Sequence, residues 1–249
     1  MSGSAIVAGT VVETFPALSA LGIVRHGFIG RIPGLDVTTE REEALRRLEA
    51  VHRTLRADLG FSASPFATAE QVHGKEIAVL EEPFTGNFCA AGADGLVTDQ
   101  PEISLGIYVA DCAAVYLVDP VRRSIGLVHS GKKGTELAIV RRAIETMRDR
   151  FGSRPGDLVV QLSPCIRPPH YEIDFAAEIV RQARAAGVTA VHDSGRCTAS
   201  DLPRYYSYRI EKGRTGRMLA LLALASHPER SAAEPRDPAG PPRSESTQR

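Results

Sequence analysis

The sequence has little of what marks several classes of protein. Its 30 basic side chains are balanced by 30 acidic ones, so no overall charge draws it to nucleic acid or to an anionic lipid surface. No apolar run approaches the roughly 18–20 residues of a membrane span, and the start lacks the basic and apolar regions of a secretory signal. Four cysteines in 249 residues do not make a disulfide scaffold. We expect a cytoplasmic protein that binds neither nucleic acid nor a membrane.

The residues that are present suffice for a sizeable core. Hydrophobic residues make up 43% of the chain, and the length fits one large domain or two small ones. From Ser226 onward the chain holds five of its 16 prolines and no large aliphatic or aromatic residue, so this segment cannot bury enough apolar area to offset its ordering entropy. We predict one folded domain over residues 1–225 and a disordered, proline-rich tail over residues 226–249.

Three helices are predicted from the spacing of apolar residues. A capping box from Thr39 to Glu42 opens the first helix, and Gly60 ends it. The second carries apolar side chains on one face between Leu137 and Phe151. A shorter third helix is expected over residues 175–186.

Strands are predicted from β-branched and aliphatic runs bounded by turn signals. The run over residues 218–225 fits a helix or a strand equally well. Many strands with three helices inserted predict an α/β fold, a single-domain layered sandwich with a mixed β-sheet and flanking helices. The predicted strands are residues 5–14, 77–80, 103–109, 114–118, 125–129, 158–162 and 188–191.

Residues able to bind a metal stand where predicted strands begin or end. His73 precedes one strand, Cys112 interrupts two apolar strands, and His129 ends another. Functional loops gather at strand ends, so the three side chains could converge. Two imidazoles and one thiolate form a suitable set of zinc ligands, with a fourth position open for water or substrate. Zinc would also lower the pKa of a bound water toward neutrality.

Other interpretations stay open on these residues alone. A cysteine between apolar strands is usually a buried small hydrophobic residue, and a histidine at a strand end is usually hydrogen-bonded within the fold. The chain has no CxxC or HExxH spacing. A Cys–His nucleophile pair without a metal, as in cysteine hydrolases, would use the same side chains.

Several short motifs follow one another along the chain: His26-Gly27-Phe28, Gln71-Val72-His73-Gly74, Ala93-Asp94-Gly95-Leu96-Val97-Thr98-Asp99, Ala110-Asp111-Cys112, His129-Ser130-Gly131 with Gly134-Thr135, Tyr206-Ser207-Tyr208-Arg209 and Thr215-Gly216-Arg217-Met218. Taken in this order, they resemble the YfiH-like family. This family is also called the multicopper polyphenol oxidase or laccase-domain family and is associated with purine nucleoside phosphorylase activity. The resemblance covers about residues 20–225 and implies a mixed α/β sandwich related to a toxin cysteine-hydrolase domain.

The resemblance implies one zinc ion on His73, Cys112 and His129. It implies phosphate-dependent cleavage of adenosine, inosine, guanosine and methylthioadenosine, and deamination of adenosine, by a monomer or homodimer. A copper-dependent polyphenol oxidase is the alternative, although seven histidines without a His-rich cluster argue against a multicopper centre. A metal-binding member that has lost catalysis is the other alternative.

Site residues follow from the same motifs. Asp94, Asp111 and Cys112 are predicted to be catalytic, the two acids either orienting a ligand histidine or acting as a base. The residues predicted to bind the nucleoside or phosphate all have polar side chains and lie in or near a motif: Arg31, Gln71, Lys132, Lys133, Arg209 and Arg217.

Three departures from the family pattern concern the substrate pocket. The usual Trp-Arg pair is Lys132-Lys133 in this tryptophan-free chain, the usual Gly-Pro-Ser-Ile is Ser163-Pro164-Cys165-Ile166, and a family loop is shortened at residues 31–36. We expect one wall of the nucleoside pocket to be remodelled. Lysine keeps the charge of arginine but loses its bidentate fork. We predict that Lys133, with Lys132, binds phosphate at the start of a helix more loosely than the family arginine.

Overall fold

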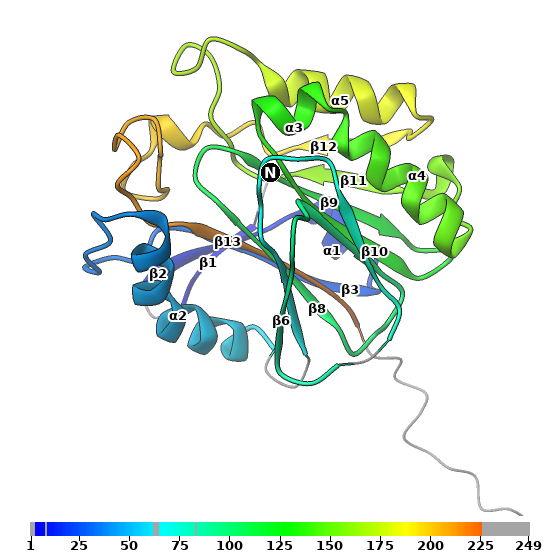
Figure 1. The fold of residues 1–249 in the computed structure, drawn as a ribbon, viewed down its shortest axis with the longest axis horizontal. Coiled ribbons are helices and arrows are strands. Elements are labelled where there is room, and N and C mark those ends of the chain that lie inside the picture. Colours follow the sequence, from blue (N-terminus) through cyan, green and yellow to red (C-terminus); the bar gives the residue numbers. More distant parts are fainter. Residues whose placement is uncertain (1–2, 8, 62–64, 83, 226–249) are drawn as a thin grey trace, which may run out of the picture.

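The computed structural model describes residues 3–7, 9–61, 65–82 and 84–225. Two sheets are stacked face to face, and helices cover both outer faces (Figure 1). The predicted class, an α/β layered sandwich, is therefore confirmed, with two mixed sheets rather than one. The predicted tail over residues 226–249 lies outside the described residues. No helix in the described ranges is long and apolar enough to cross a membrane.

The first sheet has seven strands in the order β1-β2-β3-β13-β8-β4-β6. β1 and β2 form an antiparallel hairpin where one continuous strand was predicted. The ambiguous run near residue 220 is a central strand, β13, paired with β3 on one side and β8 on the other. The strands are β1 (Gly3–Val7), β2 (Thr10–Thr14), β3 (Val24–Ile29), β13 (Met218–Leu224), β8 (Ser104–Val109), β4 (Phe66–Ala69) and β6 (Asn87–Ala90).

The second sheet has six strands in the order β12-β11-β9-β10-β7-β5. Every residue of β9 and β10 is buried, because this sheet is covered on both faces. In β9, Tyr116 packs toward the first sheet, whereas Val115 and Leu117 pack toward the helices, as the two-residue strand period requires. The strands are β12 (Ala190–Asp193), β11 (Val159–Leu162), β9 (Ala113–Asp119), β10 (Ser124–Ser130), β7 (Gly95–Thr98) and β5 (Ile77–Leu80).

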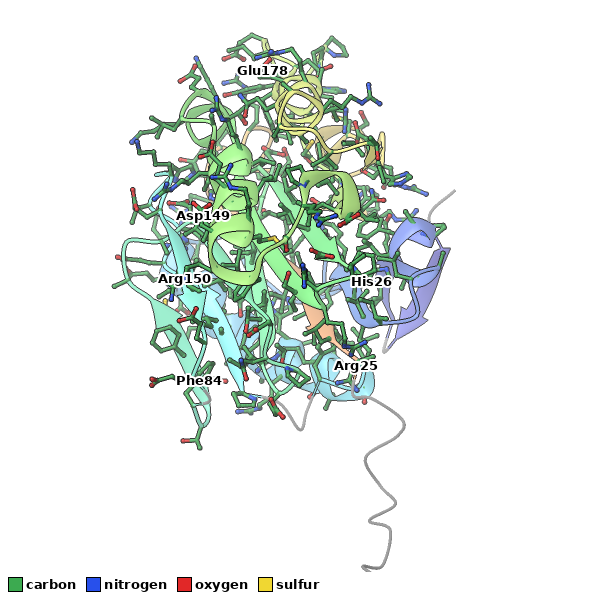
Figure 2. All side chains as sticks on the ribbon, turned by 90° about the vertical axis from the view of Figure 1, so that its right-hand side faces the viewer. Arg25, His26, Phe84, Asp149, Arg150 and Glu178 are labelled. Carbon is green, nitrogen blue, oxygen red and sulfur yellow. The ribbon has the colours of Figure 1, made fainter. Side chains whose placement is uncertain are left out.

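The helices lie on opposite sides of the stacked sheets. α2 covers the first sheet, and α3, α4 and α5 lie over the second (Figure 1). Arg150, labelled in Figure 2 near the end of α4, forms an exposed ion pair with Glu81, just beyond β5. The helices are α1 (Pro16–Ser19), α2 (Arg41–Asp58), α3 (Lys132–Glu136), α4 (Ile139–Phe151) and α5 (Phe175–Ala185).

Two details of the predicted helices are wrong. The N-cap residue of α2 is Glu40, and no side chain caps the helix, so Thr39 does not open a capping box. The helix predicted around residues 137–151 is interrupted at Ala138, whose φ of 55° is left-handed, and this break separates α3 from α4. Leu137 consequently lies 40% exposed instead of joining the apolar face.

Candidate metal centre and cleft

The three predicted metal ligands meet at one end of the second sheet. Strand register explains this, because Ala113 pairs with Ser130, and Gly95 pairs with both Val128 and Ile77. The start of β9, the end of β10 and the start of β5 therefore share one edge. The residue before β9 lies on the crossover from the first sheet, so one ligand comes from the connection between the sheets.

The ligand atoms of His73, Cys112 and His129 all lie within 4.8 Å of one another. The two imidazole rings meet edge to face with centroids 4.8 Å apart. His73 is exposed, Cys112 is half-buried and His129 is buried. One thiolate and two imidazoles, gathered with one side open to solvent, fit a zinc ion with a vacant fourth position.

Asp94 holds two of these ligands in place. Its carboxylate accepts a hydrogen bond from His129 Nδ1 at 2.8 Å and from the backbone N–H groups of Val72, His73 and Gly74 at 3.1, 2.9 and 2.7 Å. Burial opposes ionisation of Asp94, but these hydrogen bonds hold its pKa below the usual value. With Nδ1 of His129 hydrogen-bonded to Asp94, Nε2 is the nitrogen that would bind a metal.

Gln71 fixes the start of the same loop. Its side-chain amide donates to the Tyr108 carbonyl at 2.6 Å and accepts from the Tyr108 N–H at 3.0 Å, as a neighbouring strand would. Both Gln71 and His73 have left-handed backbones, with φ of 64° and 59°. Gln71 lines the cleft described below, but its amide is already committed to β8.

Asp111 shapes the crossover that carries Cys112. Its φ is 80°, and its carboxylate accepts from Thr198 Oγ1 at 2.6 Å, Ser207 Oγ at 3.1 Å and the Arg209 N–H at 2.7 Å. These bonds join two distant loops to the crossover. The Asp111 carboxylate is thus occupied by hydrogen bonds within the fold.

Cys112 and His129 favour opposite charges. Burial raises the pKa of the Cys112 thiol, but the imidazoles of His129 and His73 outweigh it and lower the pKa from 9.0 to about 6. Burial lowers the pKa of His129, but Cys112 and Asp94 outweigh it and raise the pKa from 6.5 to about 9. The site therefore stabilises the thiolate that a metal needs as a ligand.

The three ligands open into a cleft of about 780 Å³. Aromatic rings give it apolar walls, and cations outnumber acids along it. The rings are those of Tyr108, Tyr171, Phe175 and Tyr208, the cations Arg41, Lys132, Arg209, Lys212, Arg214 and Arg217, and the acids Glu40 and Asp111. A planar heterocycle and an anion are the chemical groups that such a surface suits.

The structure brings together some of the predicted substrate residues and not others. Lys132, Arg209 and Arg217 line the cleft, whereas Lys133 does not, and α3, which both lysines begin, is only five residues long. Arg31 also lies outside the lining, where it pairs with Glu211 at 2.8 Å. Asp94 is fully buried and does not line the cleft.

Several cleft residues escaped the sequence prediction. Arg41 was interpreted only as part of a helix start. Lys212 and Arg214 had a signal that was overlooked, because basic residues recur at positions 209, 212, 214 and 217 within a short turn-rich segment, as in a cationic loop. Among the aromatic members, Tyr208 stands in the Tyr206-Ser207-Tyr208-Arg209 motif, whereas Tyr108 and Phe175 come from separate segments without a local signal. The residues missed are Arg41, Tyr108, Tyr171, Phe175, Lys212 and Arg214.

Comparison with known proteins decides the family. The model of a family described as multi-copper polyphenol oxidoreductase laccase matches residues 25–183 and 170–225. The chain belongs to this family. A purine nucleoside phosphorylase of Deinococcus radiodurans is 32% identical over 235 residues, which cover 81% of this chain and 89% of that protein. Purine nucleoside phosphorylase YlmD of Geobacillus stearothermophilus is 29% identical over 227 residues, covering 76% and 81%.

Solved structures agree with this membership. The crystal structure of YlmD from Geobacillus stearothermophilus matches with a TM-score of 0.72 and 25% identity, over 91% of this chain and all of that one. The Bacillus licheniformis hypothetical protein YfiH matches with a TM-score of 0.74 and 21% identity, over 89% and 99%. The family and the fold predicted from the motifs are both confirmed.

Proposed function

We propose that this chain is a zinc-dependent purine nucleoside phosphorylase. The observation that carries the proposal is the convergence of His73, Cys112 and His129 in one cationic, aromatic-walled cleft. Relatives of similar length bear the name purine nucleoside phosphorylase. The proposed substrates are adenosine, inosine, guanosine and methylthioadenosine, together with phosphate.

The donor set favours zinc over the coppers of a laccase. His73, Cys112 and His129 would hold one ion, and when bound it would act as a Lewis acid beside the substrate. Among the described residues, this is the one cluster of three side chains with suitable ligand atoms. A multicopper centre needs several such sites, so copper-dependent phenol oxidation is the weaker proposal.

In the proposed reaction an oxygen of phosphate attacks the anomeric carbon of the nucleoside. The bond from that carbon to the purine nitrogen breaks, and the base leaves with the bonding electrons and takes up a proton. The accessible cleft rings, Tyr171 and Tyr208, stack the purine, while the cations hold the phosphate in line with the bond. Binding both reactants in one cleft lowers the entropic part of the barrier.

Deamination of adenosine is proposed only as a side activity. Zinc deaminases pair the metal with a free carboxylate that shuttles protons. Here the Asp94 carboxylate accepts four hydrogen bonds and that of Asp111 accepts three, so we assign both to positioning rather than to proton transfer. This arrangement favours phosphorolysis as the main reaction.

A nucleoside panel tests the proposal. Zinc-loaded protein is incubated with each of the four nucleosides, with and without inorganic phosphate, and products are separated by chromatography. Phosphorolysis gives free base and pentose 1-phosphate in equal amounts, and only with phosphate. Inosine formed from adenosine without phosphate would identify deamination. Zinc-loaded protein that gives neither product would overturn the proposal and leave a metal-binding protein without catalysis.

A further inference from the structure

Arg217 is a buried cation that forms no ion pair with any described residue. Two arginines of the described segments are buried, Arg56 with 7% and Arg217 with 8% of its surface exposed. Arg56 has Glu49 at 3.9 Å, whereas Arg217 forms no ion pair with a described carboxylate. Burying an unpaired charge costs several kcal/mol in general. A bound anion that pairs with the guanidinium would offset this cost.

The Arg217 guanidinium is anchored at one nitrogen and open at its other edge. Nη1 donates to the carbonyls of Thr215 at 2.7 Å and Gly216 at 2.9 Å. Nε and Nη2 donate to no described residue, and the side chain lines the cleft. The edge formed by Nε and Nη2 is the fork with which arginine binds carboxylate or phosphate oxygens.

A second guanidinium, that of Arg41, lines the same cleft. Arg41, the first residue of α2, donates from Nη2 to the Glu70 carbonyl at 2.9 Å and forms no ion pair with a described acid. Burial lowers the pKa of Arg217, and Arg41 is the next largest cause, so the two charges repel each other. Their proximity is favourable only when an anion lies between them.

Neighbouring residues complete a cationic patch, here named the Arg41–Arg217 cluster, of Arg41, Lys212, Arg214 and Arg217. Arg214 Nη2 reaches the Thr38 carbonyl at 3.5 Å. None of the four is ion-paired with a carboxylate in the described ranges. Arg209, in the same cleft, differs because it forms an ion pair with Glu172.

The acids of the cleft do not neutralise this cluster. Asp111 directs its oxygens to Thr198, Ser207 and the Arg209 N–H. Glu40 lines the cleft but forms no ion pair with a described cation. Asp111 and Cys112 offset part of the charge on Arg217 from a distance, but four cations outnumber the two acids of the cleft, so the cluster keeps a net positive charge.

We infer that Arg41 and Arg217, supported by Lys212 and Arg214, form a binding site for a tetrahedral oxyanion, and that its occupant is inorganic phosphate. Two guanidinium groups can donate several charge-assisted hydrogen bonds to one phosphate. The role of this phosphate as co-substrate rests on the proposed function, whereas its binding does not. The site is distinct from the start of α3, where the sequence predicted phosphate on Lys133 and Lys132.

Direct binding of inorganic phosphate tests this inference. Isothermal titration calorimetry compares the wild-type protein with Arg41→Ala, Arg217→Lys and Lys132→Ala. Arg41→Ala removes one charge at the surface, and Arg217→Lys keeps the charge but removes the fork. Arg41→Ala and Arg217→Lys should each weaken phosphate binding by about tenfold or more, the effect of losing charge-assisted hydrogen bonds. Arg46→Ala, on the same helix but outside the cleft, is the matched control and should bind as the wild type does.

The possible outcomes separate the site from the reaction. Wild-type protein that binds no phosphate, or Arg41→Ala and Arg217→Lys variants that bind it normally, would overturn the site. A loss confined to Lys132→Ala would also overturn it and place the anion at α3. Thermal unfolding without phosphate, together with adenosine binding, checks that Arg217→Lys is folded; if it is not, Arg41→Ala decides. Phosphate binding that needs both arginines, without nucleoside cleavage, supports the site and rejects the proposed function.

Discussion

A β-carbon on Gly131 would lie 2.4 Å from the sulfur of Cys112. The backbone at Gly131 has a φ of −103°, which any residue can adopt, so glycine is needed there for space alone. The chain between β10 and α3 thus passes directly against the thiolate. This contact joins the end of β10, which carries His129, to the candidate metal centre.

The first prediction concerns that contact. Gly131→Ala should push the Cys112 sulfur out of place and lower zinc affinity by about 10–100-fold, as changes in the residues that support a ligand do. Metal content after dialysis against a weak chelator measures the effect. Gly134→Ala is the control, because its added carbon would meet Ile139 at an ordinary 3.4 Å. Equal zinc retention in both variants would contradict the account.

Asp94→Asn tests the support of the two histidines. Asparagine keeps one acceptor oxygen, but its N–H₂ group would face N–H groups that now donate hydrogen bonds to the Asp94 carboxylate. His73 and His129 should therefore both lose their orientation. We expect zinc affinity to fall by about 10–100-fold, as measured by competition with a chromophoric chelator. Asp99→Asn, at an exposed position, should leave the affinity unchanged. An unaltered affinity in Asp94→Asn would show that the carboxylate does not position the ligands.

Much of the fold follows from local patterns, and the exceptions have physical causes. Gly152 and Gly187 adopt positive φ just beyond the ends of α4 and α5, where glycine commonly ends a helix. Residues 218–225 form a strand only because β3 and β8 flank them, which no local period can reveal. The break at Ala138 was missed because alanine is a strong helix former, and the turn between α3 and α4 overrides that preference.

The site was predictable to a similar extent. The motifs carry His73, Cys112 and His129 directly, and the structure brings these three predicted ligands together. The motifs did not separate side chains that face the cleft from those that brace it, so Arg31 was expected in the pocket although it pairs with Glu211. Arg41 could not be placed in the cleft from sequence, since it joins Arg217 only through the packing of α2.

We predict that buried histidines make the folded protein less stable at low pH. Burial, and next the nearby Arg56, lower the pKa of His52 to about 3, and burial lowers that of His26, on β3 (Figure 2), to about 4. Above pH 6.5 these histidines are neutral in both states. As the pH falls below that value, the unfolded chain takes up protons that the folded chain refuses, so stability is lost.

His52→Leu should reduce this loss. Both ring nitrogens of His52 are buried without a hydrogen-bond partner, so an apolar replacement removes an unsatisfied polar group. Relative to the wild type, the variant should gain about 1.4 kcal/mol in free energy of unfolding for each pH unit below the ordinary histidine pKa. Urea unfolding of both metal-free proteins at neutral pH and at about pH 5 gives the comparison. Parallel losses in the two proteins would contradict the prediction.

Tyr171 tests the aromatic wall. Its ring lies under the Arg209 guanidinium, 5.1 Å from the centroid, and meets Phe175 edge to face. Tyr171→Ala should raise KM for the nucleoside by about tenfold or more, since stacking of a base on an aromatic side chain contributes about 1–3 kcal/mol, while KM for phosphate changes little. Tyr171→Phe keeps the ring and should behave as the wild type. Equal effects on both constants would argue against a purine on this wall.

Phosphate-dependent release of purine from inosine by protein stripped of metal and then reloaded tests the central claim most directly. Chelated protein should release no hypoxanthine, and one equivalent of zinc should restore release in the wild type but not in Cys112→Ala, which lacks the sole thiolate of the cluster. Cys89→Ala, an exposed cysteine outside the cluster, should recover with the wild type. Full turnover by protein free of measurable metal, or by zinc-loaded Cys112→Ala, would contradict the account.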